Sequence, residues 1–188
     1  MNRKVFLSVV SVAFAVVIFI GCGGNSDNTN QKNNENMGNF YEKLVKNGGG
    51  DFRDVIINKT TLDEAKKNEE ESALAQTTDQ NVKYSYMIDD NNRYDVKYYC
   101  DENGLLNLIA VDYYSWGPTG DEAFDNGTKL YDKFFKEFTD KFGEGKKYTE
   151  RQYNFYGKSK SGADIKILLS DTSQKGSSGT VSINISLK

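Results

Sequence analysis

The 188-residue chain contains no histidine, one proline and two cysteines. The absence of histidine excludes imidazole acid–base catalysis, the Ser-His-Asp triad and nearly every zinc site. Two cysteines are too few for a disulfide framework. The sequence also lacks a Gly-x-Ser-x-Gly motif and a glycine-rich phosphate loop. We therefore expect a protein that is not an enzyme and that holds no cofactor or metal.

Apolar residues make up 37% of the chain and aromatic residues 13%, with 12 Tyr and 11 Phe. That content is enough to build a hydrophobic core, and it argues against wholesale disorder. The length fits one ordinary domain.

The first 22 residues have the features of a lipoprotein signal peptide. Arg3 and Lys4 precede an apolar run of 16 residues, which is shorter than the roughly 20 residues of a membrane-spanning helix. The run ends in Phe-Ile-Gly-Cys at residues 19–22, which resembles a bacterial lipobox, with Phe19 where leucine is usual. The alternatives are an uncleaved membrane anchor and an ordinary secretory signal.

On the lipoprotein interpretation, residues 1–21 are removed and Cys22 carries diacylglycerol. Gly23 follows the cysteine, where an aspartate tends to retain Gram-negative lipoproteins at the inner membrane. The outer membrane is therefore favoured if the source is Gram-negative. Loss of Arg3 and Lys4 makes the net charge of −3 more negative by two. Such an acidic chain is a poor nucleic-acid binder, and its attachment to the membrane must come from the lipid.

Residues 23–37 are polar and rich in asparagine, which predicts, together with the lipidated cysteine, a flexible tether over 22–37. We expect the folded domain to occupy residues 38–188. Within it, residues 39–47 are a short helix candidate with apolar pairs spaced four apart, ended by glycines at 48–50.

The rest of the chain divides into two similar halves, over about 52–116 and 120–188. In the first, a capping box at Thr61–Glu64 predicts a helix through about Glu70. Alternating apolar residues then predict strands at 82–88, 94–100 and 105–114, with an Asn103-Gly104 hairpin turn of type I′. In the second, an apolar stripe predicts a helix at 126–142, capped by Gly143 and followed by three strands.

These patterns predict an α+β fold made of two tandem units, each a helix plus a three-stranded antiparallel sheet. Three stretches of this chain resemble a known group of proteins, and they are Thr61–Ala65, Asp101–Gly104 and Lys141–Gly143. They are similar to uncharacterised bacterial lipoproteins with tandem units, whose architecture resembles the β-lactamase-inhibitor-protein-like fold. That resemblance implies protein binding, as in the characterised relatives, and it transfers no functional residue to this chain.

Adjacent tyrosines are the strongest candidates for a binding site. In the pairs Tyr98-Tyr99 and Tyr113-Tyr114, the two rings of each pair must point to opposite faces of a sheet. With Trp116 on the following loop, Tyr99 and Tyr114 form a candidate binding face. The alternative is ordinary cross-strand packing.

Two further features have simple structural interpretations. The oxygen-rich stretch 89–95 departs from the calcium-loop pattern and is typical of a solvated turn. Cys100 fits a small buried residue better than a reactive thiol.

Our leading hypothesis is a non-catalytic envelope lipoprotein that binds a protein partner, of the inhibitor, immunity or assembly type. The alternative is a small-ligand or glycan-binding lipoprotein that uses the same aromatic residues.

Overall fold

The computed structural model describes residues 49–188. The predicted signal peptide, Cys22, the tether and the helix expected over 39–47 lie outside the described residues. Among the described helices, none is long and apolar enough to cross a membrane.

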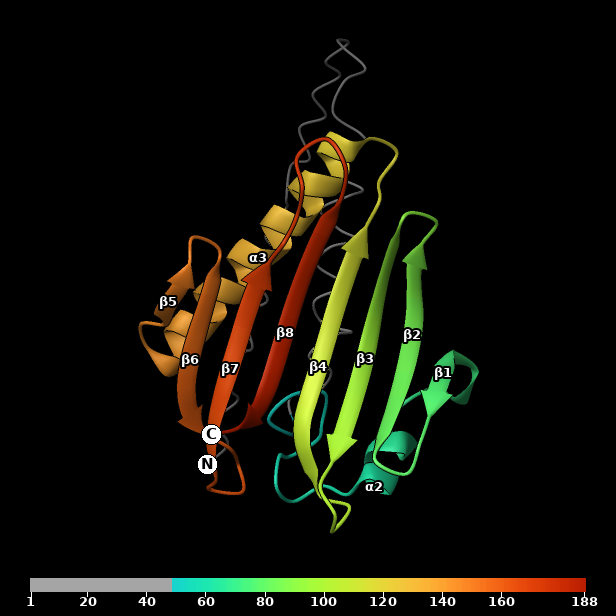
Figure 1. The fold of residues 1–188 in the computed structure, drawn as a ribbon, viewed down its shortest axis with the longest axis vertical. Coiled ribbons are helices and arrows are strands. Elements are labelled where there is room, and N and C mark those ends of the chain that lie inside the picture. Colours follow the sequence, from blue (N-terminus) through green and yellow to red (C-terminus); the bar gives the residue numbers. More distant parts are fainter. Residues whose placement is uncertain (1–48) are drawn as a thin grey trace, which may run out of the picture.

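The described chain is built on one antiparallel sheet of eight strands (Figure 1). Their spatial order is β1-β2-β3-β4-β8-β7-β6-β5. In chain order the strands are β1 (Leu74–Thr77), β2 (Asn81–Asp89), β3 (Asn92–Cys100), β4 (Leu106–Ser115), β5 (Lys146–Thr149), β6 (Gln152–Lys158), β7 (Asp164–Asp171) and β8 (Gly179–Leu187).

The predicted fold of two tandem helix-plus-three-strand units is wrong. The last strand, β8, pairs with β4 along its length, from Leu108 opposite Ser186 to Ser115 opposite Gly179. This pairing joins the two halves into one continuous sheet, so the fold is mostly β, with one long helix. Each half also has a fourth strand, β1 or β5, at an edge of the sheet. Pattern analysis missed these two strands because all four residues of each are exposed and show no alternation.

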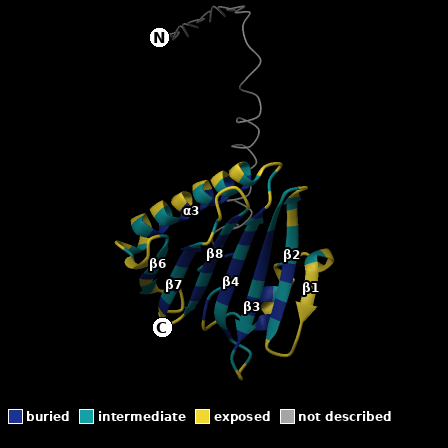
Figure 2. Ribbon diagram, turned by 45° about the horizontal axis from the view of Figure 1, so that its top comes forward, coloured by how far each residue is buried: buried dark blue, intermediate teal, exposed yellow. Residues whose placement is uncertain are grey.

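The long helix α3 (Gly120–Phe142) crosses one face of the sheet and packs on β4, β6, β7 and β8. Its outward side is exposed and its inward side is buried (Figure 2). It begins six residues before the predicted start because the Thr119 side chain accepts a hydrogen bond from the Glu122 backbone N–H. The predicted end is confirmed, since Gly143 caps the helix with a φ of 80°.

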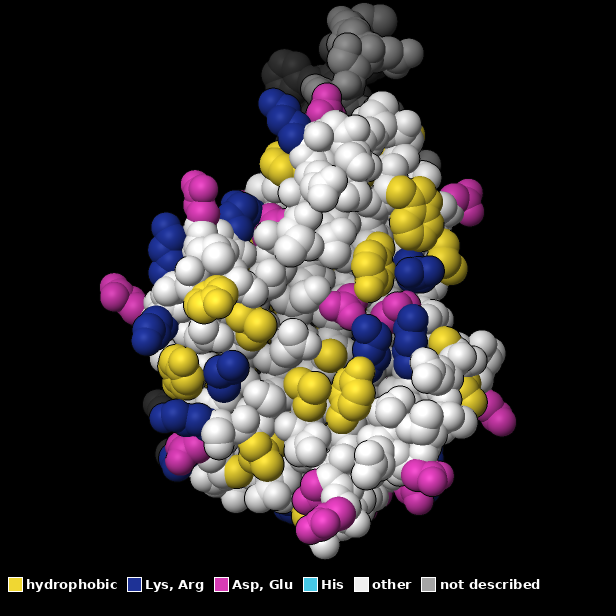
Figure 3. Space-filling view, in the orientation of Figure 1, with side chains coloured by type: hydrophobic (Ala, Val, Ile, Leu, Met, Phe, Trp, Pro, Cys, Tyr) yellow, Lys and Arg dark blue, Asp and Glu magenta, His cyan; other side chains and the backbone are white. Residues whose placement is uncertain are grey.

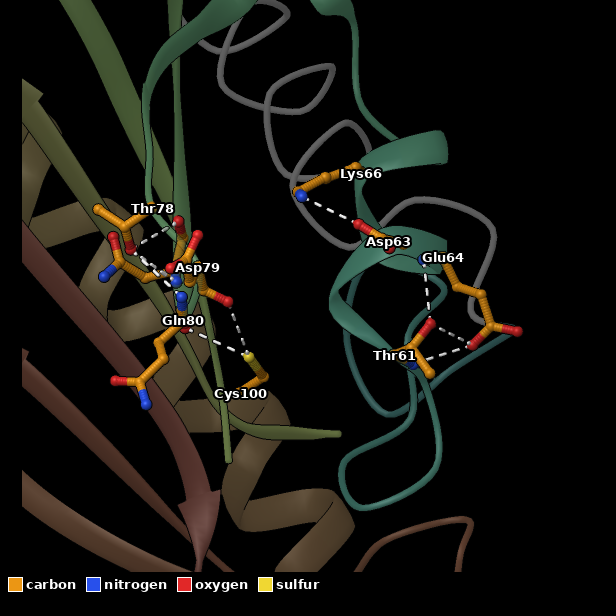
Figure 4. Close-up of polar contacts among 9 residues, drawn as sticks. Thr61, Asp63, Glu64, Lys66, Thr78, Asp79, Gln80 and Cys100 are labelled. Carbon is orange, nitrogen blue, oxygen red and sulfur yellow. Dashed lines mark hydrogen bonds and ion pairs between the residues drawn. The ribbon is translucent and has the colours of Figure 1, made fainter. Parts of the chain in front are cut away.

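The short helix α2 (Leu62–Lys67) packs on β2 and β3. Its predicted capping box is confirmed: the Thr61 hydroxyl accepts from the Glu64 N–H at 3.2 Å, and the Glu64 carboxylate accepts from the Thr61 N–H at 2.9 Å (Figure 4). The helix ends three residues earlier than predicted, and a 3-10 turn (Glu71–Ala73) follows. Leu74 follows this turn on edge strand β1 and is exposed.

The β3–β4 hairpin was predicted correctly, but its turn type was not. Within this turn only Gly104 has a positive φ, of 76°, whereas a type I′ turn needs a positive φ at Asn103 as well. The Gly104 N–H donates to the Asp101 carbonyl at 3.0 Å, as in a type I turn followed by a left-handed glycine. The Asp101 carboxylate selects this turn because it accepts from the N–H groups of Asn103 and Leu105.

The hydrophobic core lies between the helices and one face of the sheet. The alternating residues of the strands fill it, including Val96, Val111 and Ile183, which are neighbours across β3, β4 and β8. From α3, Leu130, Phe134 and Phe138 pack against them. The core is continuous across both halves, which is why they fold as one unit.

The loop from Asp51 to Thr60 ties the two halves together at the helix side of the sheet. The Asp51 carboxylate accepts hydrogen bonds from the Ser159 hydroxyl at 2.6 Å and from the Lys160 N–H at 2.7 Å, in the turn between β6 and β7. Two residues later, Arg53 forms a buried ion pair with Glu69, which follows α2. The loop therefore joins the turn between β6 and β7 to the segment that follows α2.

Candidate binding face

The second face of the sheet, which we call the open face, is covered by none of the described helices. It is formed by residues that alternate with the core positions and are mostly half-buried. On the central strands these residues are Arg93, Asp95, Lys97 and Tyr99 on β3, Leu108, Ala110, Asp112 and Tyr114 on β4, and Thr180, Ser182, Asn184 and Ser186 on β8. Figure 3 shows this face, with charged side chains near its middle and hydrophobic groups around them.

Two carboxylates lie side by side at the centre of the open face. Strand register places Asp95 directly opposite Asp112. Each has its own lysine: Lys83 Nζ lies 2.7 Å from Asp95, and Lys97 Nζ lies 2.8 Å from Asp112. The Asp95 side chain is only 2% exposed, so its charge depends on these partners.

Hydroxyl groups complete this row of polar residues. Ser85 donates to Asp95 at 2.8 Å, and Ser182 donates to Asp112 at 2.7 Å. The hydrogen bond and charge of Asp112 raise the pKa of Lys97, which keeps that lysine protonated. The two carboxylates, their lysines and their hydroxyl donors therefore form one polar network across β2, β3, β4 and β8.

Beside this network lies a group of one cation and three apolar side chains, which we call the Arg93 patch. The Arg93 guanidinium carbon lies 4.9 Å from the Tyr114 ring centre and 6.0 Å from the Trp116 ring centre. Met87, opposite Arg93 on β2, is 60% exposed and Trp116 is 42% exposed. The Trp116 indole N–H donates to the Asp90 carbonyl at 3.1 Å, which holds the ring against the β2–β3 turn.

The aromatic rings of Tyr114 and Trp116 position Arg93 more than its polar contacts do. Its Nε is buried and has no hydrogen-bond partner among residues 49–188, and its nearest carboxylate oxygen, on Asp95, is 3.5 Å away. The side chain is nonetheless 40% exposed. The exposed part of the side chain is therefore accessible to a group that docks on this face.

The structure brings together only two of the three predicted site residues. Tyr114 and Trp116 both belong to the Arg93 patch. Tyr99 lies six residues from Arg93 along β3, which is roughly 20 Å, and it is opposite Leu108. All three are on the open face, as the tyrosine-pair argument requires, because Tyr98 and Tyr113 are the buried members of the pairs.

Sequence reasoning missed the contributions of Arg93, Asp95 and Met87. The alternation that placed Tyr94 and Val96 in the core also puts Arg93 and Asp95 on the opposite face, so that signal was present. Their neighbours on β4 depend on strand register, which the sequence alone does not specify.

The remaining candidates have structural roles. Asp89 accepts hydrogen bonds from the Asn91 N–H and from the Asn92 amide, as expected for a turn. Residues 49–188 contain no group of three or more potential metal-ligating side chains. Cys100 is buried, and its thiol lies 3.5 Å from the Gln80 carbonyl (Figure 4).

Comparisons with family models, curated proteins and solved structures found no match to this chain. The resemblance to the β-lactamase-inhibitor-protein-like fold therefore stays a prediction.

Proposed function

We propose that this protein is a non-catalytic, lipid-anchored protein of the cell envelope that binds a protein partner through the open face. The anchoring rests on the lipobox-like sequence at residues 19–22. The binding role rests on one observation: Arg93 is held over Tyr114 and Trp116 and is still 40% exposed.

The composition of the Arg93 patch supports a protein partner. Tryptophan, tyrosine and arginine are the residues most enriched at the energetic centres of protein interfaces, and methionine is enriched there as well. Large rings already fixed by neighbours lose little conformational entropy on binding. The network of Asp95, Asp112 and their lysines borders the patch and supplies the polar rim that such interfaces have.

The chain offers a direct way to test this role because Trp116 is its one tryptophan. Tryptophan fluorescence therefore reports on the Arg93 patch alone. The chain from residue 38 would be immobilised, and envelope extract from the source organism passed over it. A protein retained at a ratio near 1:1 would be purified and titrated against the free chain. Saturable binding with a change in fluorescence supports the proposal.

Matched variants separate the patch from the rest of the face. Tyr114→Ala combined with Arg93→Ala should weaken binding at least about tenfold, as expected for an interface centre. Tyr156→Ala is the control, since Tyr156 on β6 is exposed to the same degree as Trp116 (43% and 42%) but lies on the far half of the sheet. Equal affinity of both variants would contradict the proposal.

A second candidate, glycan binding, is favoured by the open face of β8. Its four side chains there, Thr180, Ser182, Asn184 and Ser186, are all small and polar, and they form a hydrogen-bonding strip between β4 and β7. Tyr114 and Tyr156 lie on either side of this strip and could stack on sugar rings. A panel of cell-wall oligosaccharides, titrated against Asn184→Ala and the wild type, tests it. The absence of a response to every oligosaccharide in the panel would exclude glycan binding, and only the protein-partner proposal would remain.

A further inference from the structure

A separate cavity lies on the helix side of the sheet, opposite the open face. Its volume is about 230 Å³. The walls come from the last turns of α3, from the sheet and from the loop that follows residue 49. The large apolar side chains that line the cavity are Phe52, Phe138, Phe142, Ile165, Ile167 and Ile185. An apolar space of this kind favours a hydrocarbon group over water.

Three lysines stand at the edge of this cavity: Lys141 on α3, Lys158 on β6 and Lys160 in the turn after it. All three are exposed. Lys158 pairs with Asp164 at 2.8 Å, and Lys160 Nζ donates to the Gly49 carbonyl at 3.1 Å. Lys141 lies over the Phe142 ring, 5.1 Å from its centre, and forms no hydrogen bond or ion pair with residues 49–188. Its ammonium group is therefore available to an anion.

Two acidic residues, Asp51 and Glu137, also line the cavity. The Asp51 carboxylate already accepts three hydrogen bonds, from the Ile57 N–H, the Ser159 hydroxyl and the Lys160 N–H. Burial, followed by the nearby charge of Asp140, raises the pKa of Glu137 above its usual value. Three lysines against two acids leave the lining of the cavity with an excess of positive charge.

We infer that this cavity binds a single-chain amphiphile with an anionic head, such as a carboxylate or a phosphate. The alkyl chain would occupy the space between Phe138 and Ile167, and the head would contact Lys141 at the mouth. The occupant follows from charge complementarity, because an apolar space whose lining has an excess of positive charge matches an alkyl anion and not an alkyl cation. This inference does not depend on the open face or on its partner.

The test uses three probes with the same ten-carbon chain: decanoate, decyl phosphate and decyltrimethylammonium, each below the concentration at which it forms micelles. The chain from residue 22, with Cys22→Ser, keeps every described residue. Labelled isoleucine methyl groups provide the readout, since Ile165, Ile167 and Ile185 line the cavity and Ile109 does not. Saturable shifts of the first three, with Ile109 unmoved, support the inference.

The two anions should bind at least about tenfold more tightly than the cation. A preference between decanoate and decyl phosphate would distinguish a fatty acid from a phosphorylated lipid as the source. Equal affinity for the anions and the cation, or no saturable shift of the three methyl groups, would overturn the inference.

Two variants test the residues. Lys141→Gln should weaken decanoate binding about fivefold, as expected for one exposed charge contact. Lys129→Gln is the control, because Lys129 is exposed on the same helix but does not line the cavity. Phe142→Trp should narrow the cavity and reduce binding whatever the head group. Unchanged decanoate affinity in both Lys141→Gln and Phe142→Trp would refute the assignment.

Discussion

Arg53 and Glu69 form a two-point ion pair inside the core. Arg53 Nη2 lies 2.6 Å from one carboxylate oxygen, Arg53 Nε lies 3.0 Å from the other, and the two side chains are 1% and 0% exposed. The hydroxyls of Tyr86 and Tyr98 also donate to Glu69. Four donors on one carboxylate compensate for its removal from water, and the pair fixes the loop after residue 49 to β2 and β3.

Removal of one member of this pair should be costly. Glu69→Gln should lower the free energy of unfolding by roughly 3 kcal/mol or more, because it leaves the Arg53 charge buried without its counter-ion. Urea denaturation measures the change. Asp63→Asn is the matched control: Asp63 pairs with Lys66 on the surface, so this substitution should leave stability nearly unchanged. Similar losses in the two variants would contradict this account of the pair.

The same pair should make the fold sensitive to acid. Burial alone would raise the pKa of Glu69, but the hydrogen bond and charge of Arg53, helped by Tyr86 and Tyr98, lower the pKa below the usual value. The contribution of Glu69 is therefore fully present above the unfolded pKa of about 4.3 and is lost as the pH falls through the lower folded value. Melting curves between about pH 7 and pH 3 should show the gap between wild type and Glu69→Gln narrowing in acid. A constant gap would show that Glu69 does not titrate with folding.

Gly127 should be intolerant of alanine although it lies within helix α3. In an exposed helix, glycine-to-alanine replacement stabilises by about 1 kcal/mol. Here an added Cβ would lie 2.3 Å from the Ser173 hydroxyl and 2.8 Å from the Gly179 backbone on β8. We therefore expect Gly127→Ala to destabilise by roughly 1–3 kcal/mol. Thermal melts measure the change. The control is Asp125→Ala, on the exposed side of the same turn, which should be neutral or slightly stabilising. A stabilising Gly127→Ala would show that the helix does not approach β8 so closely.

The predicted lipid attachment can be checked by metabolic labelling. Cells that express the full chain with a labelled fatty acid should incorporate label into the wild type and into Cys100→Ser. The Cys22→Ser variant should carry none. An unlabelled wild type would contradict the prediction and favour an uncleaved anchor or an ordinary secretory signal instead.

Much of the local structure could be predicted from the sequence. The capping box at Thr61, the glycine cap at Gly143 and the six alternating strands all depend on neighbours within a few residues, and the structure confirms them. Edge strands β1 and β5 could not be predicted because exposed strands lack the alternation that burial imposes. The candidate site was predicted in part. The tyrosine pairs correctly indicated an open face, but they did not show that Tyr99 lies far from Trp116.

The amino-acid sequence by itself determined which residues form strands and which side chains on each strand face the core, because the two-residue period of a strand is a local property. Only the tertiary structure decided which strands are neighbours. Asp112 and Ser182 are 70 residues apart in the chain, yet they share a hydrogen bond because β4 pairs with β8. The same long-range pairing merged two predicted units into one sheet. Which residues meet on the open face and around the cavity follows from packing between distant segments, which no local pattern encodes.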